Sequence, residues 1–140
     1  MKYSSGGFIL NFTMLLIIFL VILAHIIDDF VLQQLGNLHN MKQKKFWEPY
    51  NKEYNNRFCL DHYAGLVIHS ISWSIMVHLP ILLLTETPDI IILVSSIIHA
   101  INHGIIDNKK CNKHELSLSE DQLLHCIQLC LICWTGAYFV

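Results

Sequence analysis

The chain has 140 residues, of which 54% are hydrophobic and 14% are charged, and its formal net charge is −2. This length suits one compact unit rather than two, and the charged fraction is well below the roughly 25% typical of soluble domains. The composition therefore argues against a water-soluble globular domain and favours a single membrane domain over residues 1–140.

The first predicted transmembrane helix covers residues 8–32, and it is apolar without interruption from Leu15 to Leu23. About 20 residues are needed to cross the hydrocarbon core of a bilayer. A cleaved signal peptide is the competing interpretation. Only Lys2 precedes the segment and no small-x-small cleavage site follows, so a retained transmembrane helix is favoured.

Residues 33–61 are polar and mix basic with aromatic side chains. Such a mixture can bind nucleic acid, but beside a membrane span it favours anchoring at lipid headgroups. We therefore expect membrane lipids, and no nucleic acid, as partners. The basic residues are Lys42, Lys44, Lys45, Lys52 and Arg57, and the aromatic ones are Phe46, Trp47, Tyr50 and Tyr54.

Three further spans are predicted at residues 62–84, 88–107 and 119–139, with a second polar loop at 108–118. Ser119-Glu-Asp-Gln122 has the spacing of a capping box at the start of the last span. The predicted fold is an all-α, integral membrane bundle of four transmembrane helices.

Lysine and arginine predict the orientation of this bundle. They concentrate in residues 33–61 and 108–118, whereas Thr85–Asp89 has none and the N-terminus has only Lys2. The positive-inside rule places both basic loops in the cytosol and both termini outside, as in a multi-pass protein of the cytoplasmic (inner) membrane. We expect the five cysteines to be free thiols and not disulfides.

Histidines and aspartates recur at helical spacing near the predicted cytosolic ends of all four spans. Titratable groups within a span are costly and usually functional. At about 1.5 Å of rise per residue, these groups fall within roughly 10–12 Å of the helix ends. His78 lies about half a revolution from His69 and is excluded. The predicted metal ligands are His25, Asp29, His69, His99, His103, Asp107, Asp121 and His125, and Asp28, Gln33 and Gln128 are expected to orient them.

Imidazole and carboxylate together suit zinc, iron or manganese. Helical bundles build paired metal sites from inward-facing histidines and carboxylates. We therefore expect one or two divalent transition-metal ions, with a shared carboxylate if there are two. A metal ion lowers the pKa of its bound water toward about 7, so a metal-dependent hydrolase is the leading functional hypothesis.

Several motifs together resemble a family of small multi-pass membrane proteins of bacteria and bacteriophages that is labelled only as a domain of unknown function. The resemblance implies a multi-helix membrane fold but no activity. It rests on His25-Ile-Ile-Asp28-Asp29-Phe30-Val-Leu-Gln33, Lys42-Gln-Lys44-Lys-Phe-Trp47, the positions of Asp61, His69, Trp73 and Pro80, His103-Gly-Ile-Ile-Asp107, and Asp121-Gln122-Leu-Leu-His125.

Three other functions stay open at this stage. A metal-ion or proton transporter would need a path through His78, and a haem-binding bundle would use two histidines. A non-enzymatic phage or bacterial membrane factor would use the His/Asp cluster as a hydrogen-bonded core that fixes helix packing. The sequence leaves the substrate open, as it does the choice between a monomer and a homo-oligomer.

Overall fold

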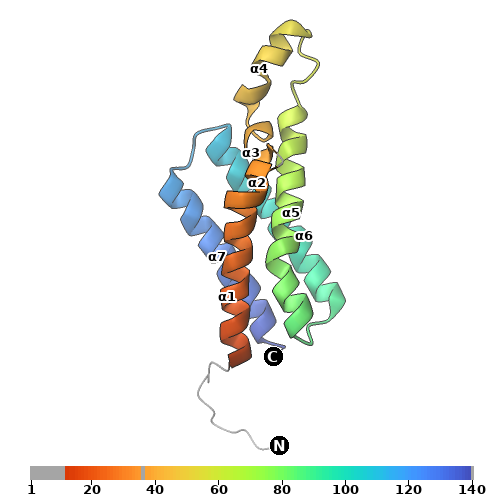
Figure 1. Cartoon of the computed structure of the whole chain (residues 1–140), viewed down its shortest axis with the longest axis vertical. Helices are drawn as coiled ribbons and strands as arrows, with labels where there is room; N and C mark the ends of the chain where they lie inside the picture. Colours follow the sequence, from red (N-terminus) through yellow and green to blue (C-terminus); the bar gives the residue numbers. More distant parts are fainter. Residues whose placement is uncertain (1–11, 36, 140) are drawn as a thin grey trace, which may run out of the picture.

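The computed structural model describes residues 12–35 and 37–139, and every regular element in these ranges is helical. Four long helical segments form the bundle (Figure 1). The first is continuous through α1 (Phe12–Ile27), the π-helix η1 (Asp28–Leu32) and α2 (Gln33–Leu35), and the others are α5 (Asp61–Leu84), α6 (Asp89–Cys111) and α7 (Leu118–Ala137). The all-α prediction is confirmed. Residues 8–11 of the predicted first span and both chain termini lie outside the described residues.

Three segments are long and apolar enough to cross a membrane, namely Phe12–Leu35, Asp61–Leu84 and Asp89–Cys111. α7 is not among them, and its first two turns carry Glu120, Asp121 and His125. The end of α7 nevertheless lies beside the α5–α6 connection, because the backbone N–H of Glu86 donates to the carbonyl of Phe139 at 3.3 Å.

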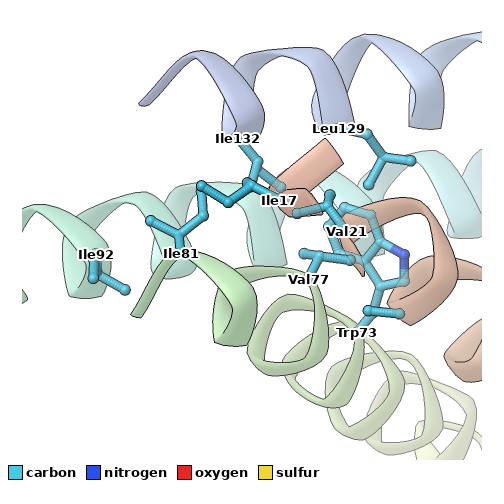
Figure 2. Close-up of a cluster of buried hydrophobic side chains, with 9 residues drawn as sticks. Ile17, Val21, Trp73, Val77, Ile81, Ile92, Leu129 and Ile132 are labelled. Carbon is cyan, nitrogen blue, oxygen red and sulfur yellow. The ribbon is translucent and has the colours of Figure 1, made fainter. Parts of the chain in front are cut away.

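The bundle has apolar side chains outside and polar side chains within. Phe19, Ile75 and Ile101 are more than half exposed, whereas His69 and His103 are almost completely buried. This distribution is the reverse of a soluble protein and fits a lipid surround. An apolar core still fills the part of the bundle toward the α5–α6 connection (Figure 2). It contains Ile17, Val21, Ala24, Trp73, Val77, Ile81, Ile92, Leu129 and Ile132.

The segment predicted as a polar loop at 33–61 is largely helical. After Asn37, which takes a left-handed φ of 56°, it forms α3 (Leu38–Met41) and α4 (Lys44–Glu53). α4 projects beyond the long helices (Figure 1). The ring of Trp47 stacks on Phe58, and its indole N–H donates to the carbonyl of Met41 at 2.8 Å. Trp47, one of the aromatic residues predicted to anchor the chain at lipid headgroups, therefore packs within the segment itself.

Two helix boundaries differ from the sequence prediction. α6 continues to Cys111, beyond the predicted end at residue 107, so Asp107 lies within a helix and not at its end. The capping box of α7 is formed by Ser117 and Glu120, not by Ser119 and Gln122. Both serine positions have an acid or amide three residues later, and only the geometry of the preceding loop decides between them.

Candidate metal centre

The π-helix η1 turns two adjacent acids into the bundle. The backbone N–H of Gln33 bonds to the carbonyl of Asp28, five residues earlier. Asp28 accepts a 2.6 Å hydrogen bond from Ser72 on α5, and Asp29 accepts a 3.0 Å bond from the side chain of Gln33. Neighbours in a regular α-helix point about 100° apart, and π-helices occur often at functional sites. The sequence did not predict this π-helix, and the adjacent acids Asp28 and Asp29 are the one feature of the sequence that marks it.

Asp29, His69 and His103 form one of two groups of metal-type ligands found in the described residues. Nε2 of His69 lies 3.0 Å from Nε2 of His103 and 3.4 Å from Oδ1 of Asp29, and the third side of this triangle is 3.9 Å. Ligands about 2.1 Å from one ion lie about 3.0–3.4 Å apart in octahedral or tetrahedral geometry. The side between His103 and Asp29 is longer than this range, so the triangle is slightly wider than the ligand atoms of one bound ion would be. Two imidazole nitrogens 3.0 Å apart need either one proton or one cation between them.

A second group consists of His103, Asp107 and His125, all buried. Oδ2 of Asp107 lies 3.3 Å from Nε2 of His69, and Oδ1 lies 3.6 Å from Nε2 of His125. The two oxygens thus face different imidazoles, as in a carboxylate that bridges two sites. Nε2 of His103 can bind only one ion, so the two groups cannot both be complete through that nitrogen.

The cluster contains more carboxylates than ammonium groups, so a divalent cation could balance its charge. Asp28, Asp29, Asp107 and Asp121 contribute four carboxylates, and two ammonium groups reach them. Lys42 lies 2.5 Å from Asp107, and Lys110 contacts Asp121. With neutral imidazoles, two negative charges remain in a buried environment, where unpaired charge is costly. A divalent ion or two protonated histidines would balance them.

Lys42 is held in place by several backbone contacts. A Cβ atom on Gly65 of α5 would lie 2.7 Å from the carbonyl carbon of Met41, so only glycine permits this approach. The side chain of Asn112 donates to the carbonyl of Lys42 at 3.0 Å and accepts from the backbone N–H of Lys44 at 2.6 Å. Burial lowers the pKa of Lys42, but the charge and hydrogen bond of Asp107 outweigh it and raise the pKa above its ordinary value.

Lys42 was predicted to lie at the lipid headgroups, but its side chain is buried within the protein. The sequence gives little indication that Lys42 is buried. Lys42 directly follows Met41, but it otherwise belongs to the same basic stretch as the exposed Lys44 and Lys45. Its partner Asp107 lies 65 residues away in the sequence. Sequence spacing alone does not reveal such a long-range pair.

Trp73 separates the cluster from the apolar core and orients two histidines. Its ring stacks on His103 with centroids 4.1 Å apart, and its indole N–H donates to Nδ1 of His25 at 2.8 Å. Because indole is only a donor, Nδ1 of His25 is the acceptor, and a neutral His25 carries its proton on Nε2. His25 lies 3.4 Å from Asp29. It therefore adjoins the ligand groups but belongs to neither.

His99 lies outside both groups and pairs with the histidine that the sequence analysis excluded. The rings of His99 and His78 have centroids 5.6 Å apart. His78 contacts the hydroxyl of Ser95 at 2.9 Å and the carbonyl of Ser74 at 2.8 Å. The exclusion of His78 rested on which face of its helix it occupies. A helical face does not determine how far one helix is displaced along its neighbour.

The structure thus brings together five of the predicted ligands and leaves three at other positions. Asp121 lies 3.4 Å from His125 but pairs with Lys110, and Gln128 joins His125 to the carbonyl of His99. The convergent residues are Asp29, His69, His103, Asp107 and His125.

The sequence matches no family model, and no curated protein or solved structure gives a match to this chain. The family resemblance therefore stays a prediction.

Proposed function

We propose that this chain is an integral membrane protein that binds a divalent transition-metal ion through Asp29, His69 and His103. The observation that carries the proposal is the triangle of their ligand atoms, with sides of 3.0, 3.4 and 3.9 Å inside a buried bundle. Two imidazoles with one carboxylate is a ligand set used by zinc hydrolases and by non-haem iron enzymes. A divalent ion would also balance the two carboxylates that no lysine neutralises, as two protonated histidines would.

We propose metal-dependent hydrolysis as the activity of this centre. Three protein ligands leave a position open for water, and a metal ion there would supply an activated water molecule. Asp28 would orient His69, because its Oδ2 lies 3.3 Å from Nδ1, the ring nitrogen of His69 that does not face the ion. Asp107 would orient His125, whose Nε2 lies 3.6 Å from its Oδ1.

The proposed topology has four spans, with residues 33–61 and 108–118 in the cytosol and both termini outside. All lysines and arginines of the described ranges lie at 42–57 or 109–113, which supports insertion in the cytoplasmic membrane with this orientation. The contact between Glu86 and Phe139 supports α7 as the fourth span, because it places the end of α7 beside the α5–α6 connection.

Elemental analysis of the detergent-purified protein tests the metal proposal. We expect about one equivalent of a transition metal in the parent and loss of that metal in the His69→Ala, His103→Ala double variant. The His39→Ala, His114→Ala variant is the matched control, because it removes two exposed histidines that belong to neither ligand group. Absence of metal from the folded parent after reconstitution would contradict the proposal and favour a structural role for the cluster.

A second candidate function is transport of a metal ion or proton, which the His78–His99 pair favours. Together with Ser74 and Ser95, this pair extends the polar groups from His103 toward the α5–α6 connection. A transporter should carry zinc into vesicles that contain a zinc indicator, and His78→Ala should slow this flux. Vesicles of the parent with no flux above protein-free vesicles would exclude zinc transport.

A further inference from the structure

An apolar groove of about 640 Å³ runs along the seam between α5 and α6. The two helices pack side by side (Figure 1). Val67 and Ile71 of α5 and Ile97 and Ile101 of α6 line the groove, and all four are about half exposed. Its volume lies within the roughly 300–1,000 Å³ range of small-molecule sites.

A tight helix contact separates this groove from the metal centre. A Cβ atom on Gly104 would lie 2.7 Å from the hydroxyl oxygen of Ser70, and that hydroxyl donates to the carbonyl of Leu66 at 2.6 Å. Ser70 and Gly104 line the groove, while the adjacent His69 and His103 face into the bundle. The groove is therefore a second site and not an entrance to the metal centre.

One end of the groove is basic. Lys109 is exposed and pairs with no carboxylate in the described ranges, and Lys113 lies 3.9 Å from an exposed Glu115, a weak surface contact. Asn108 accepts a hydrogen bond from Asn112 through Oδ1, and its own N–H₂ group donates to none of the described residues. These groups present two cations and an amide donor, whereas Lys42 and Lys110 already neutralise acids of the cluster.

We propose that the α5–α6 groove binds an anionic phospholipid. One acyl chain lies along Val67, Ile71, Ile97 and Ile101, and the phosphate contacts Lys109, Lys113 and the Asn108 amide. Tyr63 lines the same end, where aromatic residues typically meet the interface. Basic pockets between transmembrane helices bind acidic headgroups in this way. The proposal needs α5 and α6 to lie in a bilayer, and it is independent of whether the metal centre binds an ion.

Electron paramagnetic resonance of spin-labelled lipids tests this site. The protein is reconstituted in phosphatidylcholine vesicles that contain a trace of spin-labelled phosphatidylglycerol or spin-labelled phosphatidylcholine. The motionally restricted fraction gives the relative association of the two lipids. We expect a preference for phosphatidylglycerol of up to about fivefold for each lysine that contacts it.

Two variants and one control make the test specific. The Lys109→Gln, Lys113→Gln double variant should bring the ratio of phosphatidylglycerol to phosphatidylcholine association close to one. Ala100→Phe places a large side chain in the groove and keeps both lysines, and it should lower the motionally restricted fraction of phosphatidylglycerol. Lys45→Gln, Lys52→Gln removes the same charge from α4 and should keep the parental preference. Equal association of the two lipids with the parent, or the same loss in the α4 control, would overturn the proposal.

Discussion

The ammonium of Lys42 lies 2.5 Å from Oδ2 of Asp107, the same oxygen that lies 3.3 Å from Nε2 of His69. A lysine from outside the long helices thus supplies positive charge at an oxygen that faces the candidate metal ligands. Any cation bound beside His69 would share this carboxylate with Lys42. The two positive charges should therefore weaken each other's binding.

The Lys42→Met variant should be less stable than the parent without metal but should gain more stability from metal. Loss of the ammonium leaves Asp107 buried without its partner, which costs about 3–5 kcal/mol for pairs of this kind. A divalent ion would replace the lost charge and would no longer be repelled by Lys42. Thermal unfolding in detergent, with and without zinc, measures both effects through Tm.

Lys110→Met is the control for this prediction. It removes a lysine from Asp121, which belongs to neither ligand group. We expect a lower Tm without metal, together with the same zinc-dependent increase as in the parent. If zinc raised the Tm of the two variants by equal amounts, competition between Lys42 and the ion would be contradicted.

The His103→Ala variant should lose bound metal, and His78→Ala should retain it. His103 belongs to both ligand groups, while His78 bonds to Ser74 and Ser95 away from them. Both residues are buried in the bundle, so both substitutions create a cavity. His78→Ala therefore controls for a general loss of packing. Elemental analysis after purification gives the stoichiometry, and equal retention in the two variants would show that the centre is misplaced.

A comparison of His69→Ala with His125→Ala decides which ligand group holds the ion. The Asp29–His69–His103 group has the shorter separations, so His69→Ala should abolish binding. His125 lies beside Asp107 and should act by orienting it, so His125→Ala should lower affinity by about 10–100-fold without changing the stoichiometry. Zinc titration with a competing chelator measures both quantities. Loss of binding in His125→Ala alone would assign the ion to the other group.

The sequence predicted the helical bundle and much of its polar cluster because both follow from local periodicity. His103 and Asp107 are four residues apart, so any α-helix places them on one face. The η1 π-helix does not follow from such spacing, and it is the element that brings both Asp28 and Asp29 inward. The burial of Lys42 depends on Gly65, whose missing Cβ atom allows a distant backbone to approach. These long-range features required the assembled fold.

The proposed topology predicts which faces of the membrane expose single cysteines. Cys59 is exposed between α4 and α5, and Glu86 and Tyr138 are exposed at the other end of the bundle. In variants that each keep one cysteine, an impermeant maleimide should label Cys59 only from the cytosolic side. Glu86→Cys and Tyr138→Cys should be labelled only from outside, because α5 and α7 would each cross the bilayer. Labelling of Tyr138→Cys from the cytosol would show that α7 does not span, and reversal at all three positions would invert the orientation.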